Sequence, residues 1–300
     1  MQEMLQANMF WVVASLIPSA LALISRAYRW NLLIEPLGYN PKLRNTFYAV
    51  SIGYFANLAF PRLGEVTRCG VLNKAESIPF NMLLGTVIVE RAIDVITLLV
   101  CLILTGIIEF NRLGNFLMQT IINPIIEKLK QFATSPTVII GVMLVLVVAF
   151  FVARYFRNKS IKENKESKIV QLLRGLVSGV KSIANLKRPW LFVFHSVLIW
   201  FLYFLSMYLC FSSMPSTTGL GLTAALFLLV AGGLGMSAPV QGGIGAYHLL
   251  VSQGLMLYGL SKQDGLAFAT LVHSSQLLMI VSFGSASILL LFQGNKNKIK

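Results

Sequence analysis

The sequence is poor in charged residues, and acidic residues are the scarcest of them. Only 12% of its 300 residues are charged, and Asp and Glu together number 11, whereas a soluble domain carries about 25% charged residues. Hydrophobic residues make up 56% of the chain, and the mean hydropathy is +0.74. This composition excludes an ordinary soluble domain. It predicts an all-α, polytopic integral membrane protein, a helical bundle in the bilayer.

Residues that carry catalytic or metal chemistry are also few. The three cysteines, Cys69, Cys101 and Cys210, are scattered without metal-ligand spacing or a disulfide framework. No Ser-His-Asp or paired-carboxylate pattern is present, and Gly242 to Gly245 follows no strand, so it is no nucleotide-binding motif. We therefore expect no metal, no cofactor and no enzyme activity. The apolar run from Met9 to Ile24 lacks the flanks of a signal peptide and predicts a first spanning helix instead.

Long apolar segments account for most of the chain. They predict about seven spans within a single transmembrane domain that covers residues 1–300. A shorter apolar segment lies near 45–60. The predicted spans are 8–25, 81–108, 137–155, 190–213, 219–236, 243–260 and 266–292.

Positive charge is concentrated in one loop. The net charge is +14, and ten of the 25 Lys and Arg residues lie between Arg154 and Arg188. Loops rich in Lys and Arg remain cytoplasmic, which explains this cluster better than nucleic-acid binding. The 154–189 loop and the C-terminus are therefore predicted to be cytoplasmic, in a multi-pass protein of the cell (inner) membrane. Arg26, Arg29, Lys42 and Arg44 similarly place the first loop inside.

Counting the crossings indicates that one apolar segment does not span. If 45–60, 81–108 and 137–155 all crossed, the most basic loop would lie outside. If 45–60 enters and returns on the cytoplasmic side, every loop obeys the charge rule. Gly53 and Asn57 weaken this helix, Pro61 ends it and Gly64 permits a turn. The sequence thus predicts a re-entrant segment at 45–64.

The second half of the chain repeats this pattern. Apolar residues run from Leu220 to Ala238, and helical character is then lost around Pro239 and the glycines that follow it. Interrupted apolar segments in corresponding halves indicate an inverted repeat with a binding site near the midplane. Charge counting allows 219–260 to be either two spans or a second re-entrant hairpin. The Gly232–Gly235 cluster is equally explained by close helix packing.

Ionisable residues inside the apolar segments are the candidate binding residues of the first half. Glu90 and Asp94 are four residues apart and share a helix face, and Arg91 could pair with Glu65. Such residues usually face a bundle interior or a wet cavity, although a neutralised cluster could be purely structural. Arg62 and Arg68 could grip a phosphate or merely mark topology. The first half of the predicted site comprises Asn57, Pro61, Arg62, Gly64, Glu65, Arg68, Glu90, Arg91 and Asp94.

The second half of the predicted site lies around the glycine-rich interruption. His248 begins a helix beside Tyr247, and His273 lies inside the last apolar segment. A lone intramembrane histidine is more often a satisfied hydrogen-bonding residue than a ligand, and that alternative stays open for both. The residues predicted here are Pro239, Gln241, Gly242, Gly243, His248 and His273.

Four short motifs in order resemble a known family over roughly residues 20–290. They are Arg26-Ala27-Tyr28-Arg29-Trp30, Gly64-Glu65 with Arg68, Glu90-Arg91 with Asp94, and Pro239 with Gly242-Gly243-Ile244-Gly245. Together they resemble the lysylphosphatidylglycerol synthase transmembrane region, a flippase-like family. The chain departs from the family in having His248 where an acidic residue often follows the glycines, and in offering no room for a soluble synthase domain.

The resemblance implies that the protein binds a lipid, a phospholipid or a lipid-linked anionic headgroup, and moves it between leaflets. Its expected partners are anionic membrane lipids and no nucleic acid; a homo-oligomer is compatible with the sequence. Two alternatives remain at this point. One is an intramembrane enzyme that acts on a lipid phosphate with Glu90 or Asp94 and His248 as acid and base. The other is a structural or accessory subunit of a cell-envelope lipid pathway.

The re-entrant prediction can be tested by labelling single cysteines in intact cells. Residues 66–78 should label from the same, cytoplasmic side as residues 26–44, because the 45–64 segment enters and leaves there. A labelling pattern with 66–78 outside and 26–44 inside would show that the segment spans.

Overall fold

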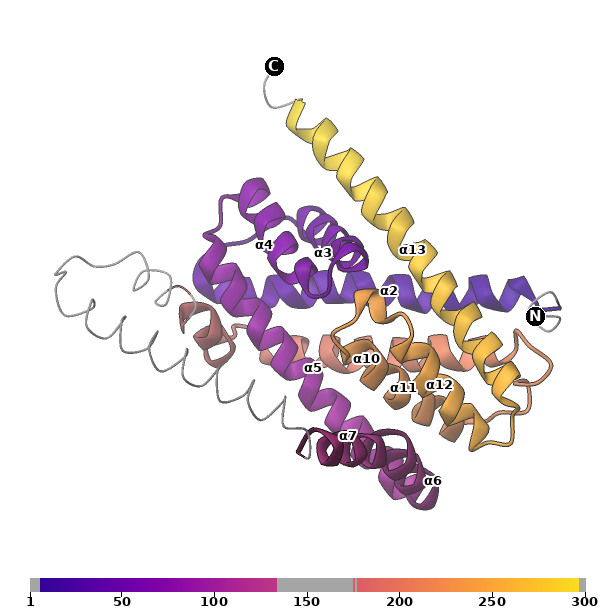
Figure 1. The fold of residues 1–300 in the computed structure, drawn as a ribbon. Coiled ribbons are helices and arrows are strands. Elements are labelled where there is room, and N and C mark those ends of the chain that lie inside the picture. Colours follow the sequence, from indigo (N-terminus) through magenta and orange to yellow (C-terminus); the bar gives the residue numbers. More distant parts are fainter. Residues whose placement is uncertain (1–5, 134–174, 176, 297–300) are drawn as a thin grey trace.

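All regular structure in the described part of the chain is helical. The computed structural model describes residues 6–133, 175 and 177–296, so the predicted span at 137–155 and most of the basic loop lie outside the described residues. Figure 1 shows long helices with shorter helices packed beside them. The long helices are α2 (Met9–Ile34), α5 (Phe80–Ile108), α10 (Pro189–Phe211) and α13 (Lys262–Lys296).

The first half consists of α2, a helical hairpin and α5. The hairpin is formed by α3 (Leu43–Ala59) and α4 (Leu63–Glu76), after the short η1 (Glu35–Leu37). Its two ends meet, because Glu76 Oε1 accepts hydrogen bonds from Lys42 N at 3.0 Å and from Asn45 Nδ2 at 2.7 Å. With 17 and 14 residues, the helices are about 26 and 21 Å long, short of a bilayer core of about 30 Å. The geometry of a re-entrant segment is therefore present, and α4 extends it beyond the predicted end at residue 64.

The sequence explains why the chain reverses at this tip. Pro61 cannot continue α3, and Arg62 adopts a left-handed conformation with φ 62°. The two helices then cross at glycines: a Cβ on Gly53 would lie 2.9 Å from Gly64 O, and a Cβ on Gly64 would collide with Gly53 O. Only glycine at both positions permits this backbone contact.

The second half has the same order of elements. Helix α10 is followed by a hairpin of α11 (Leu222–Ser237) and α12 (Ala246–Met256), and then by α13. The tip contains η4 (Gln241–Gly243) and three glycines with positive φ: Gly242, Gly243 and Gly245. At 16 and 11 residues, α11 and α12 measure about 24 and 17 Å. These lengths favour the hairpin over two spans, and they reduce the predicted number of spans below seven.

The two halves are arranged as an inverted repeat. Helices α2 and α10 run antiparallel, joined at one end by the bond from Asn8 N to Ser213 O at 2.8 Å. At the other end Arg188 lies 3.2 Å from Glu35. Helix α3 of the first hairpin packs against α13 and helix α11 of the second packs against α5, so each hairpin contacts the other half as well as its own. The hairpin tips meet where Gln241 Nε2 donates to Ala59 O at 3.1 Å.

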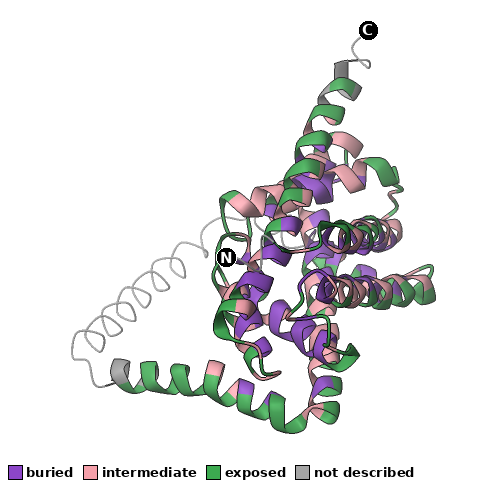
Figure 2. Cartoon of the chain, turned by 90° about the vertical axis from the view of Figure 1, so that its right-hand side faces the viewer, coloured by how far each residue is buried: buried purple, intermediate pink, exposed green. Residues whose placement is uncertain are grey.

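Apolar side chains cover the outer surface of the long helices. On α2 the exposed residues recur at helical spacing: Phe10, Val13, Ile17, Leu21 and Ile24. Buried positions lie where the helices face one another (Figure 2). Exposed apolar stripes of this length match lipid contact. By length and composition, α2, α10 and α13 can each cross a membrane, and α5 is 29 residues long.

The remaining elements lie at the ends of the bundle. After α5 the chain forms α6 (Phe110–Phe116), the π-helical η2 (Leu117–Ile122) and α7 (Asn123–Ala133), and η3 (Ser182–Asn185) leads into α10. Arg112 pairs with Glu109 at 2.8 Å and lies over the Tyr258 ring at 4.5 Å. This contact places the end of α5 beside the α12–α13 connection, opposite the base of the first hairpin.

One sequence-based prediction about the first loop is wrong. Arg26 and Arg29 were assigned to a cytoplasmic loop after a span at 8–25, but α2 continues to Ile34 and buries both side chains. The helix continues because Ala27, Trp30, Leu33 and Ile34 extend its buried face. The two arginines are therefore bundle residues, not markers of topology.

The glycine crossing predicts a large difference between two alanine substitutions in α4. Gly64→Ala should destabilise the protein by about 1–3 kcal/mol or prevent folding, because the new methyl group meets Gly53 O. Gly70→Ala is the matched control: a Cβ there has no neighbour within 4 Å, and alanine favours a helix by roughly 0.5–1 kcal/mol. Thermal unfolding in detergent measures both, and equal stability of the two variants would contradict the crossing.

Candidate functional site

A network of buried ion pairs joins α2, α4 and α5. Glu90 Oε1 accepts from Arg26 Nη1 at 2.8 Å, and Glu90 Oε2 accepts from Arg68 Nη1 at 3.0 Å. Asp94 accepts from Arg26 and from Arg29, each at 2.7 Å. Glu90 and Arg29 have no exposed surface, and Arg26 and Arg68 are 4% and 3% exposed. Such charges are retained inside a bundle only when they are paired.

Aromatic residues support the arginines of this network. The guanidinium of Arg68 lies 4.7 Å from the centre of the Trp30 ring, and that of Arg26 lies 5.9 Å from the Tyr54 ring. Trp30 is itself fixed, because its Nε1 donates to Thr86 Oγ1 at 2.8 Å. Cation–π contacts of this kind stabilise desolvated guanidinium groups. The arginines are thus held on two sides, by carboxylates and by rings.

A small pocket opens between the network and the first hairpin. It is lined by Val50, Gly53, Tyr54, Asn57, Gly64, Glu65, Arg68 and Arg91. The space open to the centre of a water molecule is about 10 Å³, roughly what one water needs. Asn57 shapes one wall, because its Oδ1 accepts from Gly64 N at 2.7 Å. In this arrangement the pocket is too small for a lipid headgroup.

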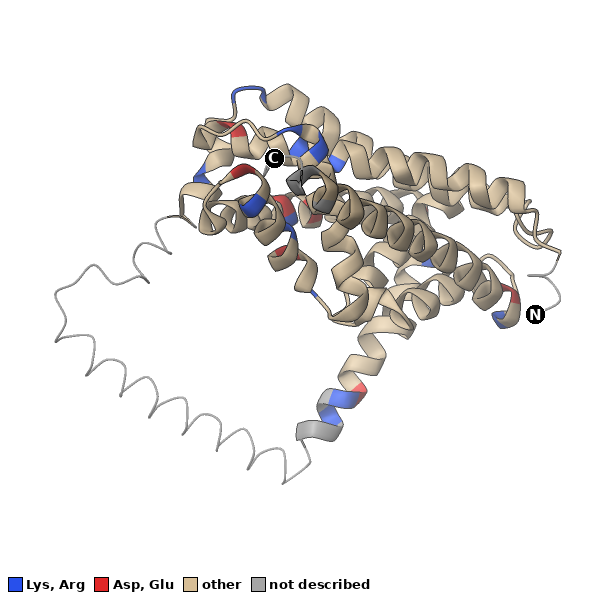
Figure 3. Ribbon diagram, turned by 90° about the horizontal axis from the view of Figure 1, so that it is seen from above, with Lys and Arg blue, Asp and Glu red and all other residues tan. Residues whose placement is uncertain are grey.

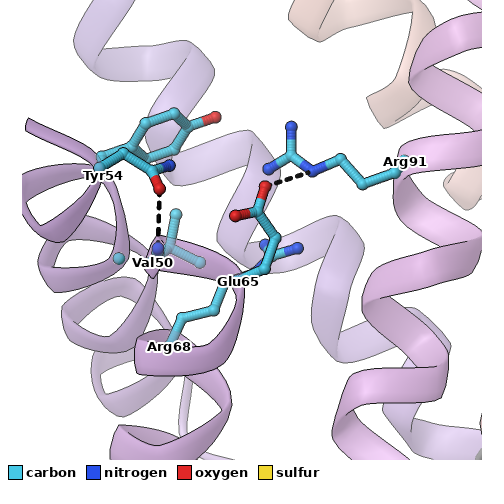
Figure 4. Close-up of a pocket in the computed structure, with 8 residues that line it drawn as sticks. Val50, Tyr54, Glu65, Arg68 and Arg91 are labelled. Atoms are coloured by element: carbon cyan, nitrogen blue, oxygen red, sulfur yellow. Dashed lines mark hydrogen bonds and ion pairs between the residues drawn. The ribbon is translucent and has the colours of Figure 1, made fainter. Parts of the chain in front are cut away.

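The predicted pair of Arg91 and Glu65 is confirmed at the mouth of this pocket. Arg91 Nε lies 3.4 Å from Glu65 Oε1, and Figure 4 shows the two side chains pointing toward each other from α5 and α4. Arg91 is 41% exposed and Glu65 is 23% exposed. Their side chains are therefore accessible, unlike those of Glu90 and Arg68.

The site carries an excess of positive charge and of hydrogen-bond donors. Four arginines, Arg26, Arg29, Arg68 and Arg91, face three carboxylates, Glu65, Glu90 and Asp94, which leaves a net charge of +1. Arg68 Nε and Nη2 are buried and have no hydrogen-bond partner among the described residues. An anion that accepts hydrogen bonds would satisfy both the charge and the donors.

The predicted residues of the second half form another cluster at the second hairpin tip. His273 Nε2 lies 2.9 Å from Gly242 O, and Gly245 N donates to His248 Nδ1 at 3.3 Å. The rings of His248 and His273 are 4.9 Å apart, and Tyr247 stacks on His273 at 4.8 Å. Gly232 and Gly235 pack against Tyr247, which favours the packing explanation for those glycines.

The structure brings most predicted site residues together in these two clusters. Pro61, Arg62 and Pro239 are exposed at the tips, and none of them has a side-chain partner among the described contacts. Glu90 and Asp94 are held by arginines, and no contact between them and His248 is found among the described residues. The sequence analysis missed Arg26 and Arg29 as site residues. Their spacing of three, on one helix face with Trp30 and Leu33 following, was the available signal.

Charged side chains are unevenly distributed over the bundle. Figure 3 shows that the ribbon segments coloured for Lys, Arg, Asp and Glu gather toward one side of the bundle, while long stretches of the helices carry none. No group of three or more His, Cys, Asp or Glu residues in the described ranges could hold a metal ion.

Fold and site together define a multi-pass α-helical membrane protein with two broken-helix hairpins around a buried ionic network. The chain belongs to the family described as the lysylphosphatidylglycerol synthase TM region, whose model matches residues 1–284. It is also 26% identical over 233 residues to the UPF0104 membrane protein MJ1595 of Methanocaldococcus jannaschii, covering 75% of this chain and 68% of that protein. No solved structure matches the chain significantly. The resemblance found in the motifs is thus confirmed.

The network predicts that two glutamates of similar chemistry differ sharply in their effect on stability. Glu90→Gln should cost about 3–5 kcal/mol, because it leaves buried arginines without their counter-charge. Glu65→Gln should cost about 0–1 kcal/mol, since its pair with Arg91 is partly exposed. Denaturant unfolding in detergent measures both variants. If Glu65→Gln is as damaging as Glu90→Gln, burial does not govern the energetics of this site.

Proposed function

We propose that this protein binds the phosphate-bearing headgroup of an anionic membrane lipid and carries it from one leaflet to the other. The observation that supports this function best is the pair of unpartnered buried nitrogens on Arg68, Nε and Nη2, in a site of net charge +1. A guanidinium presents its donors in a fork that matches phosphate oxygens. Arg68 lines the pocket behind the more exposed pair of Arg91 and Glu65, so a phosphate that passes this pair reaches these donors.

The residues of the network have different roles in this proposal. Glu90 and Asp94 accept from three arginines, so all four carboxylate oxygens are already engaged. They position the arginines and leave substrate contact to Arg68 and Arg91. Asn57 and Gly64 maintain the narrow wall of the pocket. The three carboxylates thus neutralise three of the four arginine charges, which lowers the cost of burying them in a membrane, and one positive charge remains for the ligand.

Lipid movement requires a polar site that is reachable from the bilayer. The outer faces of α2 and α5 carry exposed aliphatic residues, against which acyl chains can remain while the headgroup enters between the helices. The pocket has space for about one water. Headgroup entry therefore needs one of the hairpins to move, as expected for transporters built from inverted repeats.

The comparisons agree with this proposal at the level of substrate class. The family description refers to the synthase of lysylphosphatidylglycerol, a phospholipid. We place the protein in the cell (inner) membrane, with the base of the first hairpin, the 154–189 loop and the C-terminus on the cytoplasmic side. We further propose that it acts without catalysing a covalent reaction, as a lipid translocator.

The proposal predicts that Arg68→Lys slows lipid movement by about tenfold or more. Lysine keeps the charge that pairs with Glu90 but lacks the second set of donors, and one charge-assisted hydrogen bond contributes about 1.5–3 kcal/mol. The protein is reconstituted in vesicles that contain phosphatidylglycerol with a fluorescent headgroup. Chemical quenching of the outer leaflet then reports the rate at which inner-leaflet lipid appears outside.

Arg112→Lys is the matched control, because Arg112 pairs with Glu109 at the opposite end of α5. It should move lipid at the wild-type rate. A wild-type rate equal to that of protein-free vesicles would disprove translocation. Wild-type movement that Arg68→Lys leaves unchanged would instead remove the pocket from the lipid path.

A further inference from the structure

The second hairpin tip depends on two histidines for main-chain hydrogen bonds. Gly242, Gly243 and Gly245 have φ of 56°, 79° and 84°, so the backbone here departs from a regular helix, although Gly243 N still donates to Val240 O at 3.3 Å and Gly245 O accepts from Leu249 N at 2.8 Å. Inside a membrane such backbone groups must find other partners. Gly242 O is bonded to His273 Nε2 at 2.9 Å, and Gly245 N to His248 Nδ1 at 3.3 Å.

These partners define which nitrogen of each neutral ring carries the proton, and for His248 they also define the charge. A carbonyl oxygen can only accept, so His273 Nε2 carries a proton and donates it to Gly242 O. An amide N–H can only donate, so His248 Nδ1 is unprotonated and accepts. His273 Nδ1 is buried and has no partner among the described residues, which is consistent with an unprotonated ring nitrogen. The closed tip therefore holds two neutral imidazoles.

Protonation of either ring opposes this arrangement. A proton on His248 Nδ1 removes the acceptor that caps α12 through Gly245. A proton on His273 Nδ1 creates a cation on a residue that is 1% exposed. With both protonated, two positive rings would lie 4.9 Å apart, which is repulsive in a medium of low dielectric constant.

Within the described part of the chain, no counter-ion on the neighbouring elements offsets these charges. The ionisable neighbours of His273 on α12 are Tyr247 and His248, and its contact with η4 is the hydrogen bond to the Gly242 carbonyl. Among the described contacts, no ionisable side chain of α2 or α3 reaches His273. The carboxylates Glu90 and Asp94 are engaged by arginines. Protonation therefore favours an arrangement in which the second hairpin tip separates from α13 and the rings of His248 and His273 become hydrated.

We propose that His248 and His273 form a proton-binding site, and that proton uptake there opens the second hairpin. The coupling of this opening to lipid movement rests on the function proposed above. The ligand is a proton taken from water, bound at His248 Nδ1 or His273 Nδ1 and released again when the tip closes. His248 is partly exposed, so it is the entry point, and His273 lies behind it.

The first hairpin cannot respond in this way. Its tip is tied to arginine–carboxylate pairs through Arg68 and Glu90, whose ordinary ionisation lies outside the range between about pH 5 and 8, where unperturbed histidine changes charge. The two hairpins thus have equivalent places in the repeat but different chemistry. Only the second contains groups that bind protons near neutral pH.

The size of the effect follows from linkage. If a ring with a water-accessible pKa of about 6.5 takes a proton only when the tip is open, opening becomes about tenfold more favourable between about pH 7.5 and pH 5.5. Two such rings give up to about a hundredfold. The closed form is favoured at high pH and the open form at low pH.

Glutamine substitutions separate proton binding from hydrogen bonding. A glutamine at position 248 can still accept from Gly245 N, because glutamine is a natural capping residue at this place in a helix. A glutamine at position 273 can still donate to Gly242 O. Neither can bind a proton in this pH range. His195→Gln is the matched control. His195 is the third histidine of the sequence; it lies on α10, away from the tip, and its Nδ1 is 2.8 Å from Ser25 Oγ of α2.

Hydrogen–deuterium exchange of the protein in lipid vesicles measures opening directly. The amides of Gly243, Ile244 and Gly245 report on the tip, since their bonds lie within it or to His248. After correction for the pH dependence of chemical exchange, their protection should fall by about tenfold or more from about pH 7.5 to pH 5.5 in wild type and His195→Gln. In the double variant His248→Gln, His273→Gln it should change by less than about twofold. Each single variant should lie between these two results.

The outcomes distinguish this inference from the proposed function. An equal loss of protection in the double variant, or no loss in wild type, overturns the proton site. A tip that opens with protons while wild-type vesicles show no lipid movement supports the proton site and disproves translocation. Lipid movement that is equally fast at both pH values, with a responsive tip, disproves the coupling between them.

Discussion

The rest of the structure depends on the neutralisation of charge inside the bundle. Five ionised side chains from three helices lie where water is largely excluded, and no one of them is tolerable alone. Arg26 and Arg29 need the carboxylates of α5, and Glu90 needs Arg68 of α4. Because a buried pair is costly to separate, α2, α4 and α5 are held in one relative position. The short helix α4, which is too short to span a membrane, is linked to this network through Arg68.

Main-chain hydrogen bonding is the second constraint, and it explains the form of the two tips. A chain that reverses inside a bilayer exposes amide and carbonyl groups that lipid cannot satisfy. At the first tip Asn57 accepts a hydrogen bond from Gly64 N. At the second tip His248 accepts from Gly245 N, and His273 donates to Gly242 O. Gln241 joins the tips through Ala59 O. The predicted site residues at the tips are thus structural necessities as well as candidates for function.

The sequence predicted the structure correctly where a physical rule allowed only one arrangement of the chain. Loop charge together with Pro61 and Gly64 required a re-entrant segment, and its hairpin geometry is present. The second hairpin stayed ambiguous, because the apolar length of 219–260 suits two spans as well as two short helices. Arg26 and Arg29 were misplaced for a related reason. A basic residue at the end of an apolar run normally marks a membrane surface, and only the position of Glu90 and Asp94 in space shows that α2 continues past it.

The inverted repeat gives the two halves equivalent positions but not equivalent interactions. In the first half the hairpin is held by permanent charges, through Arg68 to Glu90, and at the crossing of Gly53 with Gly64. In the second half it is held by neutral rings and by the packing of Gly235 on Tyr247. Separating ion pairs in a membrane costs far more than breaking neutral hydrogen bonds. The second hairpin is therefore held less strongly than the first, and under the proposed function it is the one expected to move more easily.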